Sequence, residues 1–197
     1  MSKKLFGLIG TLFLALTACE STKAGDTSQV TLLLMDAPGD ILEAVVTIDE
    51  IYLQGGDGGR RVLLDVPVTV TLTDLVTETM TLLEAVVVPA GTYDQLRFVI
   101  SGGYIRVEGQ AAGTSTIFAS SGDYAGLPVG AVVGGQLVMP SFDASGLKVN
   151  VPGQLTLPEG ATTLLVDFDA RESFGLDAGL SGSWVMSPLI TGQILEE

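Results

Sequence analysis

The chain has 197 residues, of which nine are Lys or Arg and 23 are Asp or Glu, so its formal net charge is −14 at pH 7. It contains no His and a single Cys. These counts exclude a His-based catalytic triad, a His-ligated metal site, an internal disulfide and a thiolate zinc site. The acidic balance argues against nucleic-acid binding, because such proteins need Lys and Arg to neutralise phosphates.

The amino-terminal segment has the pattern of a secretory signal. Lys3 and Lys4 precede an apolar run over Leu5–Leu16, which is shorter than the roughly 20 apolar residues of a membrane-spanning helix. The motif Leu16-Thr17-Ala18-Cys19 follows and resembles the lipobox of bacterial lipoproteins. The resemblance implies that Cys19 receives acyl chains, which anchor a protein stably when there are at least two, and that cleavage removes residues 1–18. The alternative is an ordinary secretory signal with an incidental Cys.

The segment after Cys19 indicates how the mature chain is held. Cleavage would remove two lysines and no acid from a chain of net charge −14, which leaves −16. Anionic lipid headgroups repel such a surface, so acyl chains rather than electrostatics would hold it at the membrane.

The residue after Cys19 indicates the membrane. In enterobacterial sorting an Asp at this position favours the inner membrane. Glu20 stands here, so we expect the outer membrane, on its periplasmic or surface face. Residues 19–29 indicate a flexible tether, and residues 30–197 have the length of one domain.

Most of the chain has the pattern of β-structure. Short runs of Val, Ile, Leu and Thr alternate with Gly, Pro and Asp, as in strands separated by turns. The predicted strands are 30–35, 42–53, 61–65, 68–72, 81–88, 93–100, 105–108, 114–119, 132–139, 147–151, 155–157, 163–170 and 183–190. A bulge near Asp49-Glu50 would restore the alternation of the second strand, and a short helical turn is expected near Asp74–Glu78. The pattern predicts an all-β fold, an antiparallel β-sandwich of immunoglobulin-like or transthyretin-like type.

Several segments, in their order along the chain, resemble one family. They include Leu34-Met35-Asp36-Ala37-Pro38, Pro89-Ala90-Gly91-Thr92-Tyr93, Gly146-Leu147-Lys148 and Asp167-Phe168-Asp169-Ala170. From about Val30 to Ile190, their order and spacing are similar to the bacterial and archaeal lipoprotein domain catalogued as domain of unknown function 4382. The resemblance implies a secreted, often lipid-anchored, all-β domain without an established activity. The glycine-rich residues 102–135 depart from the family pattern.

Two acids share one face of the strand predicted over 163–170. Asp167 and Asp169 are two positions apart, so their side chains point the same way about 7 Å from each other. Two carboxylates on one face repel unless a cation or an arginine lies between them. Such a cation would be hard, like Ca²⁺, and needs more oxygen ligands. The candidates for those ligands are Asp36 and Asp40, and the arginines that would instead pair with the acids are Arg97 and Arg171.

Other chemistries find weaker support in the residues. Paired carboxylates also serve glycoside hydrolysis, but with 23 acids some pair always fits, so a carboxylate-based hydrolase is the less favoured alternative. Ser145-Gly146-Leu147-Lys148 matches the Ser-x-x-Lys pattern of penicillin-recognising enzymes, yet its β-rich context predicts a turn rather than the helix that this motif needs. Trp184 is interpreted as a core anchor rather than a ligand platform.

The sequence therefore predicts a lipid-anchored protein of the cell envelope that is not an enzyme and acts in binding, adhesion or scaffolding. Its expected partners are the membrane, through the acyl chains on Cys19, and an envelope protein or polysaccharide, but no nucleic acid. No cofactor is expected, except Ca²⁺ in the alternative of a cation-stabilised structural domain.

Overall fold

The computed structural model describes residues 25–37, 41–55, 59–139, 146–176 and 182–195. Over these ranges the chain is mostly β-strand, and the only helical segments described are two short turns. The predicted signal, Cys19 and Asp40 lie outside the described residues. Within the described ranges, no helix is long and apolar enough to cross a membrane.

The elements follow the predicted order closely. The first half of the chain forms β1 (Thr27–Met35), β2 (Glu43–Gln54), β3 (Arg61–Leu64), β4 (Val68–Thr71), the 3-10 helix η2 (Leu72–Val76), β5 (Met80–Pro89), β6 (Gly91–Tyr93) and β7 (Gln95–Glu108). The second half forms β8 (Ser115–Ala119), β9 (Val133–Val138), β10 (Leu147–Val149), β11 (Leu155–Leu157), β12 (Gly160–Asp169), the α-helical turn α2 (Ala170–Ser173), β13 (Phe174–Leu176), β14 (Trp184–Met186) and β15 (Leu189–Leu195). Two of the expected strands, 93–100 and 105–108, fall largely within β7, and the last expected strand is divided between β14 and β15.

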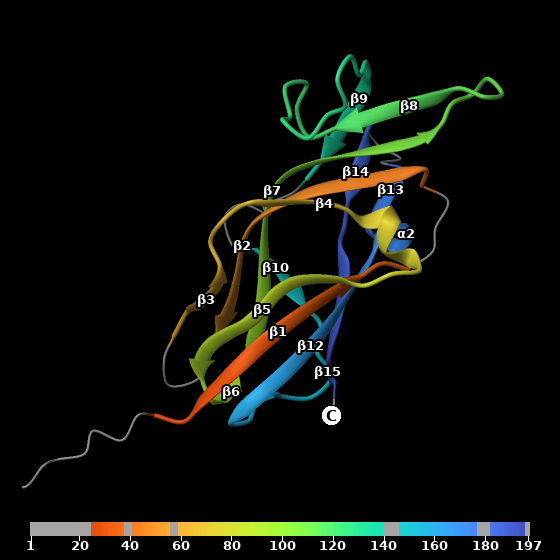
Figure 1. The fold of residues 1–197 in the computed structure, drawn as a ribbon. Helices are drawn as coiled ribbons and strands as arrows, with labels where there is room; N and C mark the ends of the chain where they lie inside the picture. The colour runs from red at the N-terminus through yellow and green to blue at the C-terminus, as the bar shows by residue number, and fades with distance from the viewer. Residues whose placement is uncertain (1–24, 38–40, 56–58, 140–145, 177–181, 196–197) are drawn as a thin grey trace, which may run out of the picture.

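Two large sheets pack together as an all-β sandwich (Figure 1). The first has the order β15-β12-β1-β5, and the second runs β13-β14-β9-β8-β7-β2-β3 with β4 beside β2 and β10 beside β7. Most neighbours are antiparallel, but β1 pairs with β12 in parallel, as do β14 with β9 and β8 with β9. The predicted antiparallel sandwich is therefore corrected to a mixed one. Long stretches of chain separate the parallel partners, so no hairpin dictates their direction. The immunoglobulin-like or transthyretin-like type stays a prediction.

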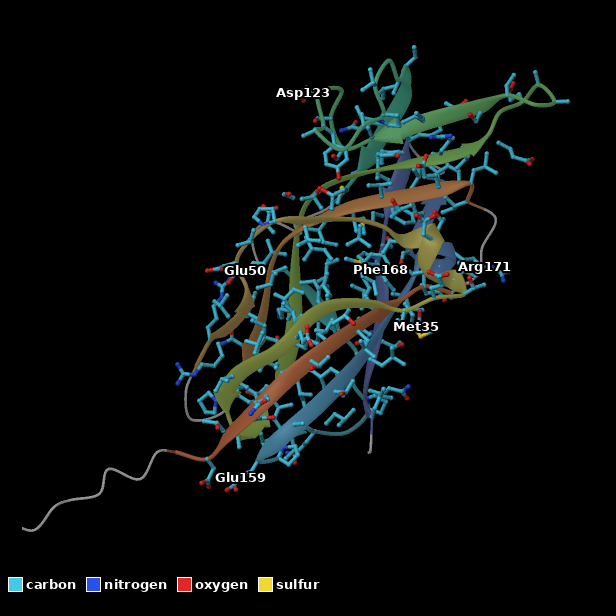
Figure 2. The ribbon with its side chains drawn as sticks, in the orientation of Figure 1. Met35, Glu50, Asp123, Glu159, Phe168 and Arg171 are labelled. Carbon is cyan, nitrogen blue, oxygen red and sulfur yellow. The ribbon has the colours of Figure 1, made fainter. Side chains whose placement is uncertain are left out.

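Alternation along the strands places the core between the sheets. On β12, Leu164, Val166 and Phe168 are buried, whereas Asp167 and Asp169 are half-buried on the opposite face, as predicted. Phe168 lies among the core side chains, while Arg171, a residue of α2, lies at the surface (Figure 2). The period of two in the sequence therefore fixes which side chains of β12 are available to a ligand.

The bulge predicted in β2 is present. The register of β2 against β7 shifts between Thr47 and Ile48 and again between Ile48 and Glu50. Because of this irregularity, Ile48 and Ile51 are both buried in the core although they are three positions apart. A regular strand would point them to opposite faces.

The first strand begins earlier than predicted. β1 starts at Thr27. Residues 27–29, which the sequence predicts to belong to the tether over 19–29, are therefore part of the domain, which starts before Val30. The reason is that Ser28 is fully buried, and its hydroxyl lies 2.9 Å from that of Thr162 on the neighbouring strand β12. The polar residues of this segment predict a tether, because nothing in the sequence indicates that Ser28 is buried against Thr162.

Part of the glycine-rich stretch packs against an aromatic ring. A Cβ at Gly102, in β7, would lie 2.8 Å from Cδ2 of Tyr124. The Tyr124 hydroxyl in turn lies 2.6 Å from Oγ1 of Thr47 on β2. The absence of a side chain at Gly102 therefore lets the connection between β8 and β9 lie against the second sheet.

The segment 147–151, which consists of β10 and the residues directly after it, closes one edge of the sandwich. β10 pairs with β7 of the second sheet, and Asn150 then forms an isolated parallel bridge to Thr191 of β15 in the first sheet. The Asn150 N–H donates to the Ile190 carbonyl at 2.8 Å, and the Gly192 N–H donates to the Asn150 carbonyl at 3.0 Å. These two bonds position residues from both sheets around one surface groove.

Candidate functional site

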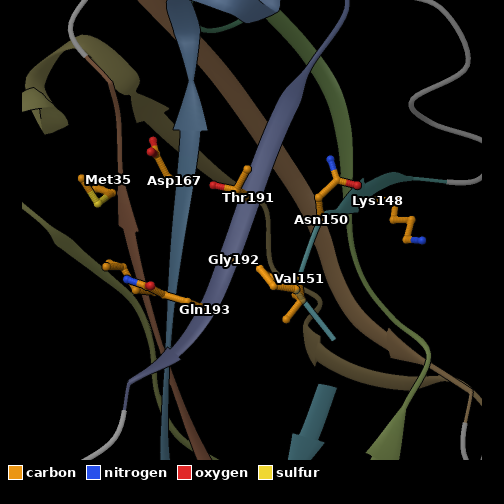
Figure 3. Close-up of a pocket in the computed structure, with 10 residues that line it drawn as sticks. Met35, Lys148, Asn150, Val151, Asp167, Thr191, Gly192 and Gln193 are labelled. Carbon is orange, nitrogen blue, oxygen red and sulfur yellow. The ribbon is translucent and has the colours of Figure 1, made fainter. Parts of the chain in front are cut away.

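A groove of about 660 Å³ lies on the outer face of the first sheet, where β1, β12, β15 and the segment 147–151 run side by side (Figure 3). Its polar side chains are Lys148, Asn150, Asp167, Thr191 and Gln193. Its apolar side chains are Met35, Val151, Pro152 and Leu165. Both the volume and the mixture of apolar and polar groups are typical of small-ligand sites in proteins.

Strand register sets four of these residues in one row across the sheet. Met35 on β1 is paired with Asp167 on β12, Asp167 is paired with Thr191 on β15, and Asn150 bridges to Thr191. Neighbouring strands lie about 4.8 Å apart, so the backbones of Asp167 and Asn150 are about 10 Å apart with Thr191 between them. The row therefore presents a carboxylate, a hydroxyl and an amide to one ligand.

The close approach of the segment 147–151 depends on Gly192. A Cβ at Gly192 would lie 2.8 Å from Cγ1 of Val149 and 3.3 Å from Cγ2 of Val151. Both valines are on the segment that closes the sandwich edge. A side chain at Gly192 would push this segment away from β15 and separate Asn150 from Thr191.

The carboxylate of Asp167 is incompletely satisfied. Its Oδ1 atom is buried and has no hydrogen-bond partner among the described residues. Burial raises the pKa of Asp167 above its ordinary value, and the neighbouring charge of Asp169 raises it further. A ligand that brings a positive charge close to this carboxylate would stabilise its ionised form against burial and against the charge of Asp169.

Lys148 is the one positively charged side chain among the described residues that line the groove. It is exposed on β10. The ion pairs found in the described ranges join Arg60 to Glu50, Arg106 to Glu43 and Arg171 to Glu172. None of them engages Lys148, so its ammonium group is available to an anionic group of a ligand.

The predicted cation ligands do not form one group in the described structure. Asp36 continues the inward-facing row of β1 and is 1% exposed, whereas Asp167 and Asp169 lie on the outer face. Asp36 Oδ1 accepts the Ala170 N–H at 2.8 Å. Asp40 lies outside the described residues, and those residues contain no group of three or more side chains suited to hold a metal ion. Calcium binding therefore stays a prediction, with Asp36 turned away from the two strand acids.

Asp36 is the most deeply buried of the three described acids. The pKa of Asp36 is raised to about 6, mainly by burial and to a smaller extent by the charges of Asp167 and Asp169, while two hydrogen bonds from backbone N–H groups act to lower it. Asp169, in contrast, accepts the Glu172 N–H at 2.9 Å and caps α2. The three acids are therefore close enough to interact electrostatically, but each has a different role.

The structure gives the two candidate arginines other partners than these acids. Arg97 donates from Nε to Gln95 Oε1 at 2.6 Å and from Nη1 to the Gly146 carbonyl at 3.0 Å. Arg171 is exposed, and its Nε lies 3.8 Å from Glu172 Oε1. Screening of the repulsion between Asp167 and Asp169 therefore depends on solvent or on a ligand.

The remaining sequence candidates take structural positions. Ser145 lies outside the described residues, and Lys148 of the same motif is on a strand rather than a helix. Trp184 packs against the edge of the core, with its ring centroid 6.0 Å from that of Phe118, as its interpretation as a core anchor expects.

Sequence reasoning missed most of the groove. The sequence predicts other chemistries for Asp167 and Lys148, and it gives no role to Asn150, Thr191 or Gln193. The signal in the sequence is that polar residues alternate with other residues in three short segments. They occupy positions 148 and 150, 191 and 193, and, as acids, 167 and 169. The bridge that brings Asn150 beside Thr191 is non-local, so a single sequence does not reveal it.

Comparison with protein families gives one match. A family model described as Domain of unknown function (DUF4382) matches residues 27–188. The match starts with β1 and ends just before β15, the strand that supplies Thr191 and Gln193 to the groove. Neither the curated proteins nor the solved structures gave a match.

Proposed function

The chain belongs to the DUF4382 family of domains of unknown function, and on this premise we propose that it is a lipid-anchored binding module of the bacterial cell envelope. In this proposal the acyl chains on Cys19 hold the protein at the membrane, the outer membrane being favoured. The sandwich domain holds a partner in the groove beside β12 and β15. The protein is a non-enzymatic binding module.

One observation carries the proposal: the groove combines an unsatisfied carboxylate, an available ammonium group and neutral polar side chains over an apolar floor. Such a surface gains free energy when a partner supplies the missing hydrogen bonds. Carboxylate-based hydrolysis needs two acids across a cleft, whereas the described lining of this groove has one, Asp167. This arrangement favours binding over hydrolysis.

The anchor is tested in cells that carry the full chain. Metabolic labelling with a fatty-acid analogue and membrane fractionation are expected to place the wild-type chain, labelled, in the membrane fraction. The Cys19→Ser variant is expected to lose the label and leave that fraction, because the thiol is the acceptor of the diacylglyceryl group. Label retained in the variant would show that the chain is anchored in another way.

The groove is tested separately by site-specific photo-crosslinking in the same cells. A photoreactive amino acid at Gln193 lies in the groove, whereas the control position, Val87 on β5, is exposed on the same sheet away from it. Adducts at Gln193 and not at Val87 are the expected result. Equal labelling of both positions, or no adduct at Gln193, would remove the groove as a binding site.

A further inference from the structure

The charges of the groove are separated across three neighbouring segments. β12 carries Asp167, and Asp169 follows it on the same face. The segment that closes the sandwich edge carries Lys148. Between them lies β15, whose residues from Leu189 to Leu195 are all uncharged. Asp167 and Lys148 therefore lie on opposite sides of one neutral strand (Figure 3).

The register gives the backbone spacing across the groove. Asp167, Thr191 and Asn150 form one row, so β12 and the closing segment are two inter-strand spacings, or about 10 Å, apart. Lys148 lies two residues before Asn150 on that segment. Its side chain lines the groove at this edge.

The ligand group that binds best at Asp167 is both a hydrogen-bond donor and a cation. Asp167 Oδ1 is buried without a partner among the described residues. Asp169, which caps α2 and is not part of the lining, adds only the field of a second negative charge. A primary ammonium group supplies three donors and one positive charge, which fits Asp167 better than a neutral hydroxyl.

The neutral side chains between the charges suit an amide backbone. Asn150 and Gln193 each offer a carbonyl oxygen and an NH₂ group, and Thr191 offers a hydroxyl, so donors and acceptors are both present. Met35 and Leu165 on the same face provide apolar contact for short side chains.

We propose that the groove binds a short zwitterionic peptide of about three residues, with its ammonium group at Asp167 and its carboxylate at Lys148. The length follows from the spacing of about 10 Å between the backbones of β12 and the closing segment, because an extended chain spans at most 3.3–3.6 Å per residue, or about 10 Å for three residues. This inference rests on the proposed function as a binding module and names the ligand of the same groove.

Two other ligand classes fit less well. A purely cationic peptide matches the net charge of −14 but leaves Lys148 facing a like charge. A polysaccharide binds well on exposed aromatic rings, and the described lining of the groove contains none. A ligand that carries both charges satisfies both sides of the groove.

The experiment is calorimetric titration of the full chain in detergent with trialanine, N-acetyl-trialanine and trialanine amide. Trialanine is expected to bind, and each blocked peptide to bind at least about tenfold more weakly, as for the loss of one charge-assisted hydrogen bond. Dialanine is too short to reach both charges and is expected to bind more weakly as well.

Variants assign each end of the peptide. Asp167→Asn is expected to lose about tenfold in affinity for trialanine and to stop distinguishing it from the acetylated form. Lys148→Gln is expected to stop distinguishing it from the amide. Glu84→Gln, an exposed position on β5 of the same sheet, changes the net charge as Asp167→Asn does and is expected to bind as the wild type does. Thermal unfolding of each variant, followed by the fluorescence of Trp184, shows whether it is folded.

Each other outcome overturns the inference. Equal binding of all three peptides would show that the charges do not take part, and equal binding of the amide alone would make the ligand simply cationic. No binding of trialanine, together with photo-adducts at Gln193, would exclude this peptide class and leave the binding module intact. No binding and no adducts would reject both proposals.

Discussion

Asp36 Oδ1 accepts a hydrogen bond from the backbone N–H of Ala170 at 2.8 Å, across 134 residues of sequence. The bond joins the end of β1 to the first residue of α2, which directly follows β12. It therefore fastens one end of the parallel strand pair. The second oxygen, Oδ2, is buried and has no partner among the described residues, so the same carboxylate that holds the fold is costly when ionised.

The stability of the protein is expected to rise on mild acidification. Burial raises the pKa of Asp36 from 3.8 to about 6 in the folded state. Between these values the folded state holds a proton that the unfolded state has released, so the stabilisation is present at pH 4 and is lost as the pH rises through 6. The free energy of unfolding should be larger at pH 4.5 than at pH 7, by at most about 3 kcal/mol. Urea denaturation at both pH values, followed by Trp184 fluorescence, measures it.

Asp36→Asn is the matched test of that pH dependence. An amide oxygen can still accept the Ala170 N–H, while the buried charge is gone. The variant is therefore expected to lose most of the dependence and to be at least as stable as the wild type at pH 7. If the variant keeps the full pH dependence of the free energy of unfolding, Asp36 is not the origin of that dependence. Asp167, whose pKa is also raised by burial, then becomes the next position to substitute.

The buried hydroxyls of Ser28 and Thr162 are expected to stabilise the fold as a pair. Their oxygens lie 2.9 Å apart, and Ser28 and Thr162 are 0% and 4% exposed. Ser28→Ala leaves the Thr162 hydroxyl without this partner and should cost about 1–3 kcal/mol. In the double variant with Thr162→Val neither hydroxyl remains, so the total loss should be smaller than the sum of the two single losses. Additive losses in urea denaturation would contradict a coupled pair.

Closure of the sandwich edge is expected to depend on Gly192. Gly192→Ala places a Cβ 2.8 Å from Cγ1 of Val149, and such overpacking costs about 1–3 kcal/mol. Val149→Ala removes the atom in the way, so in its background the same substitution should cost less. Thermal unfolding of the four proteins measures this. Equal costs in both backgrounds would mean that the strain at Gly192 lies elsewhere.

Local pattern explains how much of the fold could be predicted. The inward position of Phe168, the outward position of Asp167 and the bulge near Asp49 all follow from alternation along one strand, which a sequence displays directly. The position of Ser28 does not, because its burial depends on a hydroxyl from a strand more than 130 residues away. A polar residue next to a predicted tether carries no sign of such a partner.

The candidate site was harder to predict for the same reason. The sequence grouped Asp36 with Asp167 as cation ligands, since both are acids near a predicted turn or strand. The parallel pairing of β1 with β12 does bring them near each other, but it directs Asp36 inward and Asp167 outward. The groove itself depends on the bridge between Asn150 and Thr191, a contact between two segments whose sequences give no reason to expect it.

The two acids at the end of β12 are expected to respond oppositely to substitution, although the sequence treats them as equals. Asp169 accepts the Glu172 N–H at 2.9 Å as the N-cap of α2, so Asp169→Ala should cost about 1 kcal/mol of stability. Asp167 makes no such bond through its buried oxygen and repels Asp169, so Asp167→Asn should leave the free energy of unfolding at pH 7 unchanged or raised. Urea denaturation of both variants decides this. Similar losses would show that Asp167 also supports the fold, and its partial burial would then no longer indicate a ligand.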